Sequence, residues 1–188
     1  MLSQLSYLLS KLDESSDNKI DLLNHLKAIP SDIYVDFPNT DGVLFNILLH
    51  VDFKGTENDD IFFLALDHAP NNALGGKNRQ GKTLLHESIS LGCSNTIVNL
   101  LVDRCPTNIH TNHDKGGNTI LHAAAKRGDR TILQMLFVRF SHESIRYCAC
   151  KRNKGGRTPL FESLCTPNQS VACIYGLLQL SVSGSDLS

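Results

Sequence analysis

The chain has 188 residues, of which 41% are hydrophobic and 20% charged, and its formal net charge is -1 at pH 7. These proportions exclude an intrinsically disordered chain, and no apolar run approaches the roughly 20 residues of a membrane-spanning helix. Residues 1–70 carry four Lys/Arg against twelve Asp/Glu, whereas residues 113–157 carry ten against three. This uneven charge predicts a polarised surface and not a uniformly basic one, so we expect no nucleic-acid partner. The absence of a long apolar run predicts that the chain does not insert into a membrane.

The first 37 residues predict two helices. Apolar residues recur at helical spacing in two groups, and Pro30 ends the second helix. We expect residues 1–37 to form a helical cap on a domain that spans residues 38–188, with a separate functional module as the alternative. The two apolar faces consist of Leu2, Leu5, Leu9 and Leu12, and of Leu22, Leu26 and Ile29.

Three later stretches of the chain resemble one another. "NRQGKTLLHESISLGC" begins at Asn78, "DKGGNTILHAAAKRGD" at Asp114 and "NKGGRTPLFESLC" at Asn153. The threonines of the three stretches lie 36 and 39 residues apart. A period in the thirties is typical of helical repeat proteins.

Each repeat predicts two short antiparallel helices, because apolar or small residues fall twice at i, i+3 and i+4. A fainter copy lies upstream, which gives four units near residues 39–77, 78–113, 114–152 and 153–182. The predicted faces are Phe45, Leu48, Leu49 and Ile61, Leu64, Ala65; Leu85, Ser88, Ile89 and Ile97, Leu100, Leu101; Leu121, Ala124, Ala125 and Ile132, Met135, Leu136; and Leu160, Ser163, Leu164 and Ile174, Leu177, Leu178.

A threonine and a histidine three residues apart recur in the two central repeats, as Thr83 with His86 and Thr119 with His122. The threonine precedes the helix, where its side-chain oxygen can cap backbone N–H groups. The histidine, one turn later, can bond the hydroxyl and the adjoining loop. Because the pair recurs in register and a catalytic group is needed only once, we expect it to stabilise the fold and not to catalyse a reaction.

The segments "GKTLLHESISLG", "GNTILHAAAKRG" and "GRTPLFESL" resemble the G-x-T-P-L-H-x-A-A-x-x-G core of the ankyrin repeat, over about residues 39–180. The chain departs from that core where Leu84 and Ile120 replace Pro, where Phe161 replaces His, and in two linkers that carry insertions. The resemblance implies an all-α solenoid of helix-turn-helix units without enzymatic activity, cofactor or metal.

Ankyrin repeats bind other proteins through their turn tips and the exposed face of their first helices. The equivalent positions here are mostly cationic, which predicts a protein partner with an acidic or phosphorylated segment. An ordinary solvated surface is the alternative. The implied partner-binding residues are Arg79, Gln80, Lys82, Lys115, Asn118, Lys154 and Arg157 at the tips, and Ser90, Lys126 and Arg127 on the first helices.

A nucleotide-binding enzyme is a second hypothesis, since Gly76–Thr83 fits the pattern G-x4-G-K-[ST]. In that hypothesis Lys82 binds phosphates and Thr83 a metal ion. The pattern functions only between a strand and a helix, and "HAPNNAL" before it does not predict a buried strand.

The six cysteines favour a reducing compartment, because their spacing predicts neither a disulfide framework nor the paired ligands of structural zinc. The first residues also lack the basic region of a secretory signal. We therefore expect a cytoplasmic location. The targeting domain of a bacterial effector, which would act in a host cytosol, is a third hypothesis.

Overall fold

The structure is a computed structural model that describes residues 2–11, 16–30, 33, 42–105, 112–167 and 170–182. The described residues contain no β-strand, only two isolated bridges, and none of their helices is long and apolar enough to cross a membrane. The elements are α1 (Leu2–Ser10), α2 (Ser16–Ala28), α3 (Val43–His50), α4 (Asp59–His68), η3 (Asn71–Gly75), α5 (Leu84–Leu91), α6 (Asn95–Arg104), α7 (Ile120–Arg127), α8 (Arg130–Arg139), α9 (His142–Cys150), α10 (Pro159–Cys165) and α11 (Val171–Val182).

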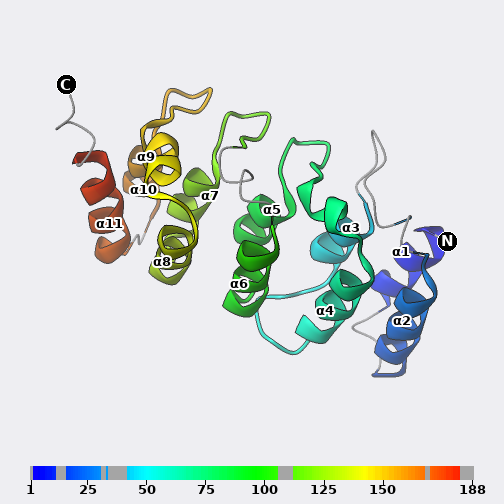
Figure 1. The fold of residues 1–188 in the computed structure, drawn as a ribbon. Helices are drawn as coiled ribbons and strands as arrows, with labels where there is room; N and C mark the ends of the chain where they lie inside the picture. Colours follow the sequence, from blue (N-terminus) through cyan, green and yellow to red (C-terminus); the bar gives the residue numbers. More distant parts are fainter. Residues whose placement is uncertain are drawn as a thin grey trace.

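The helices form a stack of antiparallel pairs, which confirms the predicted all-α solenoid (Figure 1). The first helices pack in sequence, α3 on α5, α5 on α7 and α7 on α10. The second helices form a parallel row in which α4 contacts α6, α6 contacts α8 and α8 contacts α11. One continuous apolar core runs between the two rows from Leu5 to Leu177.

Helices α1 and α2 cover the N-terminal end of this stack. They pack against each other, with α1 on α3 and α2 on α4. The predicted apolar faces are buried wherever their side chains are described, whereas the side chain of Leu2 and the whole of Leu12 lie outside the described part. The buried side chains are Leu5, Leu9, Leu22, Leu26 and Ile29.

The predicted helix starts and stops are confirmed in the central units. The Thr83 hydroxyl accepts a hydrogen bond from the backbone N–H of His86 (3.3 Å) at the start of α5. At the end of the same helix Gly92 has φ +80°, a left-handed conformation that side chains with a Cβ rarely adopt. Gly128 ends α7 in the same way, with φ +77°.

Helix α9 was not predicted, because the sequence indicated only two helices in the third unit. Ser141 starts the helix by accepting a hydrogen bond from the N–H of Ser144 (3.3 Å). Ile145, Cys148 and Ala149 are buried and share one helical face, since they are spaced i, i+3 and i+4. The insertion therefore adds a helix that packs against α7, α8, α10 and α11.

Three predicted core positions are wrong, because Leu49, Leu164 and Leu178 are exposed. Each is the i+4 member of its triplet, at the edge of the predicted face. Leu49 lies in the last turn of α3, after the last buried residue of that helix. Leu164 and Leu178 lie on the outermost helices, α10 and α11, where no further repeat covers them within the described residues.

Candidate functional site

The Thr119–His122 pair joins the third unit to the fourth. The backbone N–H of Thr119 donates to Nδ1 of His122 (3.1 Å), so Nε2 carries the ring hydrogen of the neutral imidazole. Nε2 in turn donates to the carbonyl of Arg157 (2.9 Å), in the loop before α10. Burial lowers the pKa of His122, and the Arg157 carbonyl opposes this effect. The ring is thus a neutral bridge between two repeats.

His86 occupies the same position one repeat earlier, but its outer nitrogen is not satisfied. The Thr83 hydroxyl lies 2.7 Å from Nδ1, whereas the buried Nε2 forms no hydrogen bond of standard geometry with the described residues. The carbonyl of Asn118 is near enough to raise the pKa of the ring slightly. Burial dominates and lowers the pKa to about 4, so His86 is neutral at pH 7.

The loops before the first helices are fixed to one another by hydrogen bonds. The N–H of Lys115 donates to the carbonyl of Gln80 (2.8 Å), and the N–H of Lys154 donates to the carbonyl of Gly116 (2.8 Å). These bonds set the spacing of successive tips and leave the side chains of Gln80, Lys115 and Lys154 exposed.

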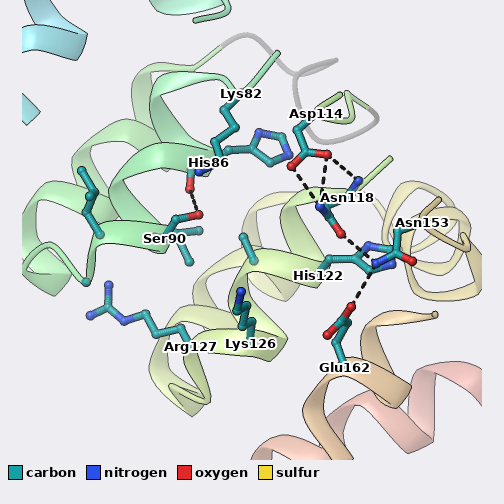
Figure 2. A pocket seen from close by; sticks show the side chains of 14 residues that line it. Lys82, His86, Ser90, Asp114, Asn118, His122, Lys126, Arg127, Asn153 and Glu162 are labelled. Carbon is teal, nitrogen blue, oxygen red and sulfur yellow. Dashed lines mark hydrogen bonds between the residues drawn. The ribbon is translucent and has the colours of Figure 1, made fainter. Parts of the chain in front are cut away.

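A cavity of about 640 Å³ opens beside α5 and α7 and extends to the loop and first turn of α10. Figure 2 shows Lys82, His86 and Asp114 near one end of it, and Lys126 and Arg127 near the other. Five of the ten predicted partner-binding residues line this cavity, which we call the groove. They are Lys82, Ser90, Asn118, Lys126 and Arg127.

The acidic side chains that line the groove are already engaged. Asp114 accepts hydrogen bonds from the backbone N–H (2.8 Å) and the side-chain amide (2.9 Å) of Asn118. Burial alone would raise the pKa of Asp114, but these hydrogen bonds outweigh burial and lower it. Glu162 accepts from the amide of Asn153 (3.0 Å) and lies 3.6 Å from the guanidinium of Arg157.

Several donors in the groove are unpaired. Among the described residues no carboxylate pairs with Lys126, which is exposed. Arg127 places Nη2 3.5 Å from Asp129, whereas its buried Nη1 has no hydrogen-bond partner within the described part of the chain. These two cationic groups can donate hydrogen bonds to an acceptor that the described residues do not supply.

The other predicted residues lie outside the groove. Arg79, Gln80, Lys115 and Lys154 are exposed at the loop tips. Arg157 lines a second cavity, of about 410 Å³, and places its guanidinium over the ring of a neighbouring phenylalanine.

The prediction from sequence did not include His86, Asp114 or Asn153 among the groove residues. A usable signal exists for His86. Ser90 follows His86 by four residues, as Lys126 follows His122, and such pairs share one helical face.

The segment Gly76–Thr83 does not have the geometry of a nucleotide-binding loop. It follows the short 3-10 helix η3 and not a strand. The ammonium of Lys82 lies 3.3 Å from Glu87, and the hydroxyl of Thr83 caps α5. The described residues also contain no cluster of three potential metal ligands.

Comparison with protein families agrees with the repeat geometry. The model of ankyrin repeats, in three copies, matches residues 44–145. The chain belongs to the ankyrin repeat family. Comparison with curated proteins gave no significant match. Ankyrin repeats are in general protein–protein interaction modules, and in this chain α10 and α11 lie beyond the matched residues.

Proposed function

We propose that this ankyrin repeat chain is a non-enzymatic interaction module whose groove binds an acidic segment of a partner protein. The proposal rests on the imbalance inside the groove. Its carboxylates are paired, whereas Lys126 and Nη1 of Arg127 have hydrogen to donate. A buried donor without a partner costs free energy, and a ligand that accepts its hydrogen bond recovers that energy.

A carboxylate or a phosphate group fits these donors better than a neutral acceptor. A hydrogen bond that involves a charged group stabilises by about 1.5–3 kcal/mol, roughly twice the value for a neutral pair. The exposed Lys115 and Lys154 at the loop tips add positive charge beside the groove. Such charge accelerates the association of an acidic partner.

Fluorescence anisotropy with two labelled peptides tests this proposal. One peptide is rich in Glu, and the other carries Gln in place of every Glu. We expect the Glu peptide to bind at least 10-fold more tightly, and Lys126→Glu with Arg127→Gln to remove that difference. The matched control, Lys27→Glu with Arg130→Gln, changes the net charge equally at exposed positions outside the groove and should retain it. Equal affinity of the wild type for both peptides would refute the proposal.

We further propose the division into a cap (residues 1–37) and a repeat domain (residues 38–188) with units near residues 39–77, 78–113, 114–152 and 153–182. One pair of stacked helices falls within each unit, and α9 falls within the third. The packing of α1 and α2 on α3 and α4 supports the role of the cap.

We propose a reducing, cytoplasmic location. No disulfide joins any two of the six cysteines, all of which lie in the described part of the chain, and two of them are exposed. Exposed thiols persist in a reducing compartment and tend to oxidise outside it. Labelling with a thiol-reactive probe in intact cells tests this location, because Cys150 and Cys165 should react without prior reduction.

A further inference from the structure

The last two helices expose an apolar surface at the C-terminal end of the solenoid. Helix α11 buries Cys173 and Leu177 and turns Gly176 toward Phe137 of α8. The large exposed side chains of α11 lie on the opposite side of the helix, at spacing i, i+4 and i+7. Helix α10 adds two more, so the end face consists of Phe161, Leu164, Val171, Tyr175 and Leu178, each 44 to 80% exposed.

This end face is large enough for a specific interface. Side chains of these types present roughly 150–200 Å² each when fully exposed, so the end face offers on the order of 500 Å² of apolar side chain. Two such faces in contact bury about 1,000 Å², which is the lower limit for a specific protein–protein interface. A patch of this size is comparable to the largest apolar patch of a typical monomeric protein, and such patches often serve as binding sites.

The charges on the end face favour contact with an identical face. Helix α11 contains no Asp, Glu, Lys, Arg or His. Glu162 is the single acidic residue of α10, and it pairs with Asn153 and Arg157 on the groove side. Apart from Arg152 and Arg157, which line a cavity together with Phe161, two copies related by a twofold axis would therefore meet without like-charge repulsion.

Head-to-tail stacking is disfavoured by the opposite end of the molecule. There α1 and α2 cover the first repeat, so the end face of one copy finds no free stacking surface on the first repeat of another (Figure 1). Contact through two identical end faces also closes the assembly at two copies.

We propose that two copies of this chain associate through the end faces of α10 and α11 to form a twofold-symmetric dimer. The groove reaches Glu162 in the first turn of α10 but shares no lining residue with the end face, so each copy retains it. A dimer then presents two grooves, and a partner with two acidic segments would bind more tightly than a partner with one.

Sedimentation velocity of the 188-residue chain over a concentration series tests the dimer. We expect a monomer–dimer equilibrium with a dissociation constant of roughly 1–100 µM, as for interfaces near the lower size limit. Val171→Glu with Tyr175→Glu brings like charges together across the twofold axis and should weaken the dimer by at least 100-fold. Both side chains are exposed, so the variant should keep its helical content and melting temperature, which circular dichroism verifies.

The matched control is Tyr7→Glu with Ile20→Glu, which changes two exposed apolar residues at the other end of the solenoid. This control should dimerise like the wild type. A wild-type chain that stays monomeric, or an assembly that grows beyond the dimer, would overturn the proposal. Dissociation caused by the Tyr7 and Ile20 changes would also overturn it, because the interface would then lie at the cap.

Discussion

At the scale of single residues, the most informative groups are the two buried histidines. Each lies beside a threonine hydroxyl, an arrangement that also occurs in catalytic sites. Their repetition in register predicted a structural role, and the contact of His122 with the next loop supplies the physical reason. The sequence could not show that Nε2 of His86 lacks the equivalent hydrogen bond, because that depends on the path of the loop before α7.

The burial of His86 predicts acid sensitivity. Its pKa is 6.5 in the unfolded chain and about 4 in the folded one, mainly because burial disfavours the charged ring. The unfolded state therefore binds more protons between these values, so the stabilisation is fully present above pH 6.5 and declines as the pH falls toward 4. We expect a loss of about 3 kcal/mol from this residue, measurable by urea unfolding at a series of pH values.

The substitution His86→Phe isolates this effect, since Phe161 occupies the equivalent position in the last unit. The variant should lose stability at pH 7, because the Thr83 hydroxyl loses its partner, and should show a flatter dependence between pH 6.5 and 4. Parallel pH profiles for wild type and variant would contradict the assignment of the effect to His86.

Because His122 bridges two repeats, replacing it should lower the free energy of unfolding more than replacing an exposed histidine does. His122→Ala leaves the buried Thr119 N–H and the part-buried Arg157 carbonyl without their partners. We expect a decrease of about 2–4 kcal/mol in the free energy of unfolding, measured by urea titration at pH 7.5. The exposed His142→Ala should change it by less than about 0.5 kcal/mol. Equal effects of the two substitutions would show that the bridge does not couple the repeats.

At the scale of elements, the sequence predicted the helices whose caps and apolar spacing agree. Helices α5 and α7 each combine a threonine start with a glycine stop, and both formed where expected. Helix α9 carried its own signal, a serine followed by Ile145, Cys148 and Ala149, but it lies where the repeat pattern predicts a linker. The exposure of Leu164 and Leu178 was not predictable from spacing, because burial depends on whether a neighbouring helix covers that edge.

The glycine that ends α5 provides a test at this scale. Gly92 has φ +80° and no atom near the position of an added Cβ, so Gly92→Ala changes backbone preference without a steric clash. We expect a destabilisation of about 1–2 kcal/mol. Gly75→Ala is the matched control, since its surroundings are equally open and its φ is not positive, and it should lie within about 0.5 kcal/mol of the wild type. Thermal unfolding measures both variants, and equal destabilisation of the two would show that the left-handed conformation of Gly92 is not the cause.

At the scale of the whole molecule, the acidic first part and basic centre of the chain lie along one stack of repeats. The repeat register places Ser90 and Lys126 at equivalent positions of successive repeats. The sequence therefore predicted that both residues, and with Lys126 a positive charge, belong to the same surface, and both line the groove. It did not predict which charges are neutralised, since the contacts of Asp114 and Glu162 arise between neighbouring loops. The unpaired donors that distinguish the groove from an ordinary charged surface are therefore visible only in the structure.

The most direct test of the groove is a titration of the ¹⁵N-labelled chain with the Glu-rich peptide, followed by NMR. We predict that the backbone amides of Ser90, Ala123 and Lys126, which line the groove, shift progressively and saturate together, whereas amides of α6 and α8 facing away from it stay in place. Shifts confined to α6 and α8, or no saturable shift in the groove, would contradict the account.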